Sequence, residues 1–263
     1  MKKIEILVTN DDGLDAKGIV AVTALMRTYG NVTVVAPVEP QSGKSAAISL
    51  EQTLRMDLVK SVPAEEGLGS LRVYGFTGTP VDCVKMGVNL FLKEEKMPDL
   101  LVSGINHGSN ASVASVYSGT LGAAAEGAIY DIPSIGFSLC SHKPDPDFTG
   151  VIHYSRIILD KLLETGISRG IYLNVNFPNI PFEEIKGIKI AHQGDGRWVR
   201  EFDKRVDPRG REYYWIIGSF LDKDEAPDAD HTLVNNGYVS VVPHRVDNTD
   251  YREKERLRDL WSF

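Results

Sequence analysis

The N-terminal part of this chain shows, in turn, the hydrophobic patterns of a strand, a helix and a second strand. Residues 4–9 are a short apolar run that predicts a strand. Residues 15–28 repeat apolar side chains at helical spacing, and Gly30 follows where a helix commonly ends on glycine. Residues 32–36 are apolar except for Thr33, which is typical of a strand covered on both faces. This order predicts an α/β fold built on a parallel sheet.

The same alternation continues along the chain. Further strands are expected at residues 46–50, 54–59, 71–76, 99–103, 133–139, 171–176 and 237–242, and further helices at 80–92, 119–130, 148–165 and 249–261. Residues 198–206 and 211–217 flank a turn and predict a long hairpin. Its aromatic side chains, Tyr213, Tyr214 and Trp215, fit either a satellite core or an arm that packs on another subunit. We expect one domain over 1–263 with this hairpin, about 194–220, protruding from it.

Composition excludes several classes of protein. The net charge of −7 argues against a partner such as duplex nucleic acid, which requires a basic surface. No run of about 20 apolar residues predicts a transmembrane helix, and no signal peptide is recognisable at the N-terminus. Cys83 and Cys140 are expected to be thiols rather than a disulfide. The prediction is therefore a cytoplasmic protein.

Two adjacent acids, Asp11 and Asp12, follow the first expected strand. Their charges repel, so a positive group is expected beside them. In an open parallel sheet, ligands bind at the carboxyl ends of the strands, which favours a divalent-metal site. Asn10 and Gly13 flank the pair, however, and Asn, Asp and Gly are also ordinary turn residues. This segment alone leaves both interpretations open.

Two more segments rich in small polar residues follow expected strands. Residues 37–45 end in Gly43-Lys44-Ser45, which is similar to the end of a phosphate-binding P-loop. Val38 stands where that loop needs its first glycine, and a strand rather than a helix is expected next, so we reject a P-loop. Residues 103–120 are too long for a routine connector, and the helix after them would direct its N-terminus at a bound anion.

The donors in these segments are carboxylates, a hydroxyl and an amide carbonyl. Such hard oxygen ligands suit Mg²⁺, Mn²⁺ or Ca²⁺ better than zinc. His107 is the histidine within the glycine-rich segment, next to Asn106. A structural and a catalytic role for His107 both remain open at this point.

Several ordered motifs resemble those of the SurE survival-protein family. They are Thr9-Asn10-Asp11-Asp12-Gly13, Gln41-Ser42-Gly43, Gly78-Thr79-Pro80-Val81-Asp82, Ser103-Gly104-Ile105-Asn106-His107-Gly108, Tyr117-Ser118-Gly119-Thr120, Asn174-Val175-Asn176-Phe177-Pro178 and Gly237-Tyr238-Val239-Ser240-Val241. The resemblance covers nearly the whole chain. It implies a Rossmann-like, mainly parallel sheet with helices on both faces, and a C-terminal β-hairpin arm that exchanges between subunits.

The resemblance also implies a metal-dependent phosphatase, a 5'-nucleotidase that hydrolyses nucleoside 5'- and 3'-monophosphates. One divalent ion per subunit, Mg²⁺ or Mn²⁺, is expected on four ligands, with the subunits forming a homodimer or homotetramer. The implied metal ligands are Asp11, Asp12, Ser42 and Asn106; the catalytic residues are Asp11, Asp12 and His107; the phosphate-binding residues are Asn10, Gly43, His107, Ser118, Gly119 and Thr120. Two alternatives stand beside this hypothesis: a non-catalytic nucleotide-binding regulator, and a hydrolase of other small phosphoesters or polyphosphate.

Overall fold

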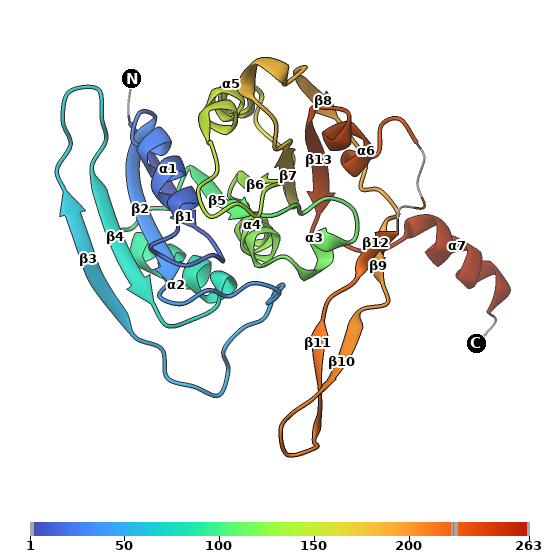
Figure 1. Ribbon diagram of the computed structural model, residues 1–263. Helices are drawn as coiled ribbons and strands as arrows, with labels where there is room; N and C mark the ends of the chain where they lie inside the picture. The colour runs from blue at the N-terminus through green and yellow to red at the C-terminus, as the bar shows by residue number, and fades with distance from the viewer. Residues whose placement is uncertain (1–2, 222, 224–225, 262–263) are drawn as a thin grey trace.

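A single sheet forms the centre of the molecule (Figure 1). The computed structural model describes residues 3–221, 223 and 226–261, and within these residues the sheet has nine strands in the order β3-β4-β2-β1-β5-β6-β7-β13-β8. The strands are β1 Ile4–Thr9, β2 Gly30–Pro37, β3 Met56–Val62, β4 Leu71–Phe76, β5 Leu100–His107, β6 Ser134–Leu139, β7 Ile171–Phe177, β8 Ile188–Ile190 and β13 Val239–Arg245. From β4 across to β7 all neighbours are parallel, while β3 and β13 run antiparallel to their inner neighbours. The expected mainly parallel sheet is confirmed.

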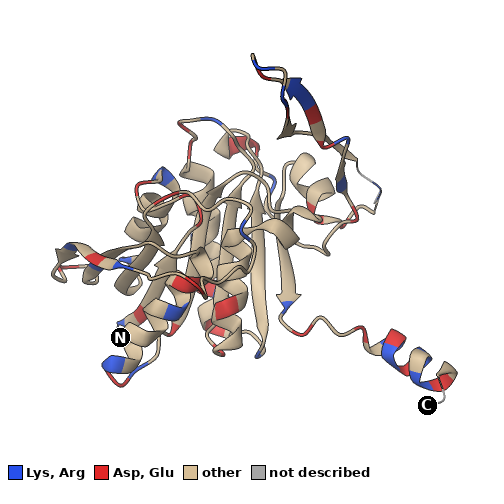
Figure 2. Cartoon of the chain, turned by 90° about the horizontal axis from the view of Figure 1, so that it is seen from below, with Lys and Arg blue, Asp and Glu red and all other residues tan. Residues whose placement is uncertain are grey.

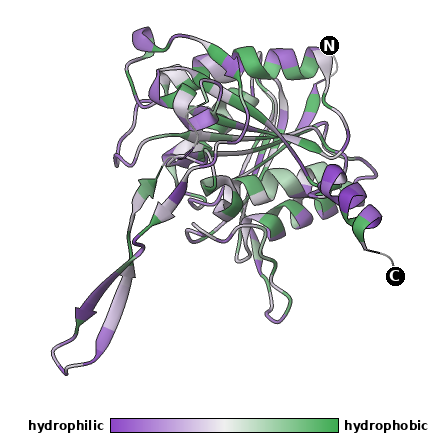
Figure 3. Ribbon diagram, turned by 90° about the vertical axis from the view of Figure 1, so that its right-hand side faces the viewer, coloured by the Kyte–Doolittle hydropathy of each residue, from purple (hydrophilic) through white to green (hydrophobic). Residues whose placement is uncertain are grey.

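Helices cover both faces of the sheet, as expected. α1 (Lys17–Met26) and α5 (Thr149–Thr165) contact each other on one face, and α2 (Pro80–Lys93) and α4 (Gly119–Ile129) contact each other on the opposite face. Each face of the sheet has a hydrophobic core, and strand β1 contributes side chains to both. Ile6 and Val8 pack on the first face, and Leu7 packs on the second. All three are fully buried, and burying each contributes about 1.5–3 kcal/mol. Figure 3 shows the apolar strands enclosed between the two helical layers.

The start of α2 also holds a neighbouring loop. Thr79 and Asp82 form a reciprocal cap, with the Thr79 N–H donating to Asp82 Oδ2 at 2.9 Å and the Asp82 N–H donating to Thr79 Oγ1 at 3.2 Å. The Thr79 hydroxyl also donates to the Ala47 carbonyl, and the Ser49 N–H donates to Asp82 Oδ1. The strand expected at residues 46–50 is therefore wrong: this segment is irregular and bonds to the helix cap instead of to a strand.

The expected hairpin is confirmed and projects from the body as a narrow arm (Figure 1). Its outer part pairs β10 (Phe202–Val206) with β11 (Glu212–Ile216), and its base pairs β9 (Arg197–Val199) with β12 (Ser219–Leu221). The terminal helix α7 (Tyr251–Leu260) also lies away from the sheet, with its N-terminus capped by the Asp250 side chain. In Figure 3 much of both segments has the colour of hydrophilic residues.

The structure also differs from the expected elements at several places after residue 103. Strand β5 extends to His107, so Ser103 to His107 lie in a strand with a register shift rather than in a loop. Residues 114–117 form the short helix α3 (Ala114–Tyr117). Helix α6 (Asp230–Asn235), together with the 3-10 turn η1 (Phe182–Glu184), was not expected from the sequence pattern.

Two expectations from composition are confirmed. Cys83 and Cys140 are free thiols. Among the residues that the structure describes, no helix combines the length and hydrophobicity that crossing a membrane requires.

Candidate active site

The candidate site lies where the strand order changes direction. The chain passes from β1 to β2 on one side, and later returns to place β5 on the other side of β1. Ligands of open α/β sheets bind at such a switch point, outside the carboxyl ends of the strands. Asp11 and Asp12 follow β1 at this edge, and Asn106 and His107 end the neighbouring β5. The fold therefore brings together two segments separated by more than ninety positions, as His107 and Asp12 show.

Asp11 is the more enclosed carboxylate, with 3% of its surface exposed. The Thr120 hydroxyl donates to Asp11 Oδ1 at 2.5 Å, and the Gln41 N–H donates to the Asp11 carbonyl at 2.7 Å. Gly119 lies directly against this side chain, because a Cβ at position 119 would sit 2.8 Å from Asp11 Cβ. Asp11 at the end of β1 is thus held by the loop after β2 through its backbone and by the start of α4 through its side chain.

Asp12 is bound by the end of β5. The His107 N–H donates to Asp12 Oδ2 at 2.9 Å, and His107 Nδ1 lies 3.7 Å from the same oxygen. The imidazole packs beside the Phe148 ring, with centroids 5.9 Å apart. Within the described residues His107 Nε2 is buried with no hydrogen-bond partner, so Nδ1 is the ring nitrogen on the carboxylate side.

Both carboxyl groups ionise less readily than they would in water, because their pKa values are raised. Burial raises the pKa of Asp11 to about 6, and the neighbouring charge of Asp12 raises it as well, against the bond from Thr120. Burial is also the main cause of the raised pKa of Asp12, which the His107 N–H partly offsets. A pair of carboxylates with raised pKa values is stabilised in its charged form by a bound cation.

The remaining expected metal ligands lie beside this pair. Asn106 is buried, and its Nδ2 donates to the Gly108 carbonyl at 2.9 Å, which leaves Oδ1 as the atom of the amide that can ligate a cation. Ser42 is exposed and follows Gln41, whose N–H is bonded to Asp11. Asn10 donates from Nδ2 to the Gly13 carbonyl, and its Oδ1 is a buried oxygen without a partner among the described residues.

This donor set fits a hard divalent cation. Among the described residues, no three His, Cys, Asp or Glu side chains gather as a metal cluster, so a cation at this edge would rely on the two aspartates together with neutral oxygens. Neutral oxygens from Asn106 and Ser42 complete a set typical of Mg²⁺ or Mn²⁺ rather than zinc.

Several of the expected phosphate-binding residues lie at the start of α4, next to Asp11. Ser118 caps α4, accepting the Leu121 N–H at 3.2 Å, so the first N–H groups of the helix open beside Asp11. The Ser45 N–H donates to the Tyr117 carbonyl at 3.1 Å, which joins the loop containing Gly43 to the segment before α4. The hydroxyl of Thr120, a residue expected to bind phosphate, donates to Asp11 Oδ1 and orients that carboxylate.

Residues that support the site were missed by the sequence reasoning. Asn110 lies in the segment after β5, with its N–H donating to Asn176 Oδ1 at 2.8 Å and its Nδ2 donating to Ser138 Oγ at 2.8 Å. Asn174 donates to the Asn110 carbonyl at 2.9 Å. The available signal was the alternation of Asn174 and Asn176 in an otherwise apolar strand, which marks polar side chains on a buried face.

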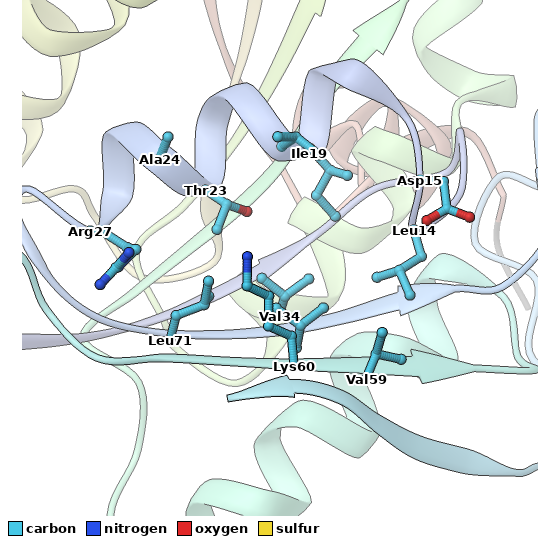
Figure 4. Close-up of a pocket in the computed structure, with 12 residues that line it drawn as sticks. Leu14, Asp15, Ile19, Thr23, Ala24, Arg27, Val34, Val59, Lys60 and Leu71 are labelled. Carbon is cyan, nitrogen blue, oxygen red and sulfur yellow. The ribbon is translucent and has the colours of Figure 1, made fainter. Parts of the chain in front are cut away.

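A second, largely apolar cavity lies elsewhere in the molecule. A cavity of 320 Å³ lies between α1 and the β3–β4 edge, lined by Ile19, Val34 and Val59 among others (Figure 4). Lys60 and Arg27 also line it, but Asp11, Asp12 and Asn106 do not. The carboxylate pair is therefore separate from this apolar cavity.

The raised pKa of Asp11 makes stability depend on pH and metal together. The folded-state value of about 6 exceeds the ordinary 3.8, so the stability that protonated Asp11 contributes is complete below about pH 4 and is lost as the pH rises through about 6. That loss is about 3 kcal/mol. Because a cation offsets it, added Mg²⁺ should raise the melting temperature markedly near pH 7.5 and little near pH 5. Thermal unfolding checks this; equal shifts at both pH values contradict it, and Asp11→Asn should lose the response.

Comparison with known proteins agrees with this geometry. The family model described as "Survival protein SurE" matches residues 6–200. A protein named 5'-nucleotidase SurE from Cytophaga hutchinsonii is 45% identical over 263 residues, covering 100% of this chain and 99% of the relative. One of the same name from Christiangramia forsetii is 46% identical, covering 100% and 97%. The crystal structure of the SurE protein from Aquifex aeolicus has a TM-score of 0.81 at 36% identity, covering 97% of this chain and 99% of that one. The chain therefore belongs to the SurE survival-protein family.

Proposed function

We propose that this protein is a 5'-nucleotidase, a metal-dependent hydrolase that converts nucleoside monophosphates into nucleoside and phosphate. The observation that carries the proposal is the meeting of Asp11 and Asp12 with Asn106 at the switch point of the sheet. The relatives named 5'-nucleotidase SurE are similar over essentially the full length of the chain, which supports the same activity here. Hydrolysis of 3'-monophosphates at the same site is part of the proposal.

Asp11, Asp12, Ser42 and Asn106 would hold one divalent cation per subunit, Mg²⁺ or Mn²⁺. Bound there, the cation supplies positive charge that neutralises the phosphoryl oxygens as the ester bond breaks. The side chains themselves have defined tasks before substrate arrives. Thr120 and the Gln41 N–H fix Asp11, and the His107 N–H fixes Asp12, so the carboxylates are oriented in advance.

The phosphate is bound beside the carboxylates by groups of the chain. The first N–H groups of α4, at Gly119 and Thr120, and the backbone near Gly43 donate to the phosphoryl oxygens, with the Ser118 segment and Asn10 completing the wall. A water molecule attacks phosphorus, and Asp11 or Asp12 accepts its proton. His107 donates a proton from Nδ1 to the leaving oxygen, since Nε2 is turned into the protein.

A competing mechanism makes Asp11 or Asp12 the nucleophile, with a phospho-aspartate intermediate. The two routes differ in one observable species. We expect rapid quench during turnover of a labelled substrate to trap no phosphorylated protein. A covalent phosphate that forms and decays at the turnover rate would establish the aspartyl route instead.

Metal binding depends on the amide of Asn106 in this account. Asn106→Ala removes a neutral oxygen ligand, and we expect Mn²⁺ to bind about 10–100-fold more weakly with the fold retained. Ser45→Ala is the matched control. The Ser45 hydroxyl donates to the Val116 carbonyl and not to an expected metal ligand. Titration calorimetry with Mn²⁺ measures both variants, and equal affinity for the two would remove Asn106 from the ligand set.

The arm suits contact with a second copy of the chain. The paired strands β10 and β11 are almost wholly exposed and carry Phe202, Tyr214 and Trp215, which are enriched at protein interfaces. Figure 2 shows charges of both signs along this arm. We propose that it joins subunits into a dimer or tetramer. Light scattering of the intact protein tests this, and a monomer at micromolar concentration contradicts it.

The substrate class is tested by phosphate release from nucleoside 5'- and 3'-monophosphates, with a sugar phosphate and a short polyphosphate as competitors. We expect the 5'-nucleotides to be hydrolysed fastest. Binding of nucleotide without release by any metal-loaded sample would favour a regulator, and preference for the competitors would favour a different phosphoesterase. A cytoplasmic location and the absence of a duplex nucleic-acid partner stay predictions.

A further inference from the structure

Asp230 is a fully buried carboxylate outside the candidate metal site. It lies at the first position of α6, and three backbone N–H groups donate to it. The Ser112 N–H donates to Oδ2 at 2.9 Å, while the Gly194 N–H and the His231 N–H donate to Oδ1 at 3.0 and 2.8 Å. Two of these donors come from distant parts of the chain: Ser112 follows β5, and Gly194 precedes the arm. The carboxylate therefore bridges the active-site segment and the base of the arm.

Other contacts reinforce this bridge. Ser112 Oγ lies 2.7 Å from His231 Nδ1, and the His231 ring packs edge-on against Phe220 of β12, with centroids 5.9 Å apart. The Val113 N–H donates to the Gly196 carbonyl at 3.4 Å. There is no room for a side chain at position 194, because a Cβ there would lie 2.3 Å from His231 Nδ1. The arm base is thus packed directly on the segment that follows β5.

The trio of Ser112, His231 and Asp230 has the composition of a hydrolytic triad but not its geometry. Asp230 Oδ1 lies 3.5 Å from His231 Nδ1, the same ring nitrogen that contacts Ser112. A triad carboxylate must instead face the other nitrogen of the ring. The Ser112 side chain is also fully buried, so no substrate reaches it. The cluster is a structural clamp rather than a second active site.

In the sequence, Ser112 lies between two segments that orient expected metal ligands. In one direction the chain runs through Asn110 to Gly108, whose carbonyl accepts the Asn106 side-chain amide at 2.9 Å. In the other direction the Ser112 carbonyl accepts the Ser115 hydroxyl at 2.8 Å at the start of α3. Helix α3 leads to Thr120, which holds Asp11. A shift at Ser112 therefore moves groups that orient both Asn106 and Asp11.

We propose that Asp230 is a positioning residue of the active site, which sets the geometry of the metal ligands by tying Ser112 to the base of the arm. Through this clamp the placement of the arm determines how tightly the site holds its cation. The inference rests on the proposed metal-dependent function. It adds a residue that contacts neither substrate nor metal.

Asp230→Asn is the direct test. The amide keeps one acceptor oxygen but turns an NH₂ toward either the Ser112 N–H or the pair from Gly194 and His231, so one side of the clamp must open. We expect Mn²⁺ affinity, followed by the electron paramagnetic resonance of the free ion without substrate, to fall about 10-fold or more. The turnover number should fall by a similar factor, with KM for nucleotide changed less.

Asp228→Asn is the matched control. It removes an exposed carboxylate from the same loop, where Asp228 Oδ2 lies 3.5 Å from His192 Nδ1 and does not contact Ser112. Wild-type Mn²⁺ affinity is expected for this variant. Folded Asp230→Asn protein with wild-type Mn²⁺ affinity and turnover number would overturn the proposal.

If Asp230→Asn does not fold, Gly194→Ala tests the proposal instead. The added methyl group wedges between His231 and Ser112 while leaving the Asp230 carboxylate in place. We expect the same loss of Mn²⁺ affinity, and wild-type affinity in a folded sample would overturn the clamp. Failure of the proposed function is separate: it appears as wild-type protein that neither binds Mn²⁺ nor releases phosphate.

Discussion

Asp12→Asn should lower the turnover of nucleoside monophosphates by about a thousandfold or more, with the fold retained. The amide occupies nearly the same volume, and its oxygen can still accept the His107 N–H that now reaches Asp12 Oδ2 at 2.9 Å. The substitution removes one of the two negative charges that attract the cation. It also removes the like charge that raises the pKa of Asp11, so the metal-free variant should melt no lower than the wild type near pH 7.5.

Asp15→Asn is the control for that result. Asp15 is an exposed acid just beyond the same turn, and the structure gives it no contact with the candidate metal ligands. Its replacement should leave phosphate release within about twofold of wild type, because surface substitutions away from a site have small effects. If Asp12→Asn retained the rate of the Asp15 variant, the assignment of Asp12 as a metal ligand would be wrong.

Gly119→Ala is expected to have the second largest effect. A Cβ at this position would meet Asp11 Cβ at 2.8 Å, Asp11 Oδ2 at 3.1 Å and Pro80 Cγ at 3.1 Å. Asp11 is enclosed and held by Thr120, so it can yield only by moving its carboxylate away from the metal position. Misplacing a catalytic group by about 1 Å costs about 100-fold in rate. We therefore expect a loss of that size in kcat, together with weaker Mg²⁺ activation.

The control for Gly119→Ala is Ala125→Gly, farther along the same helix. It lowers helix propensity by about 1 kcal/mol but leaves the start of α4 and Asp11 unchanged. Steady-state kinetics should show near-normal kcat for Ala125→Gly at a lower melting temperature. If Gly119→Ala also kept its kcat, the close approach between α4 and Asp11 would have no catalytic importance.

The sheet and the carboxylate pair could be predicted because their signals are local. Apolar runs such as residues 32–36 mark strands covered on both faces, and the helical spacing in residues 15–28 marks the crossover between them. Once the sheet is parallel, the residues after β1 must lie at its carboxyl edge, so Asp11 and Asp12 are placed without reference to distant contacts.

The support around the pair could not be predicted because it depends on tertiary contacts. Nothing in the pattern of residues 103–107 distinguishes a loop from a strand that ends beside β6. The bond from the Thr120 hydroxyl to Asp11 depends on where α4 lies relative to the end of β1. In the sequence Asp230 is only a single acid in a polar stretch. Its importance follows from the hydrogen bonds that it accepts from Ser112 and Gly194, which lie far from it in the sequence.

The account is tested most directly by measuring phosphate release from AMP by wild-type protein and Asp12→Asn side by side, first with EDTA and then with added Mg²⁺ or Mn²⁺. We predict that wild-type protein releases no phosphate with EDTA and regains activity with metal, while Asp12→Asn stays inactive under both conditions. Equal release with EDTA and with metal, or metal-dependent release by Asp12→Asn at the wild-type rate, would contradict a nucleotidase that works through a cation held by the carboxylate pair.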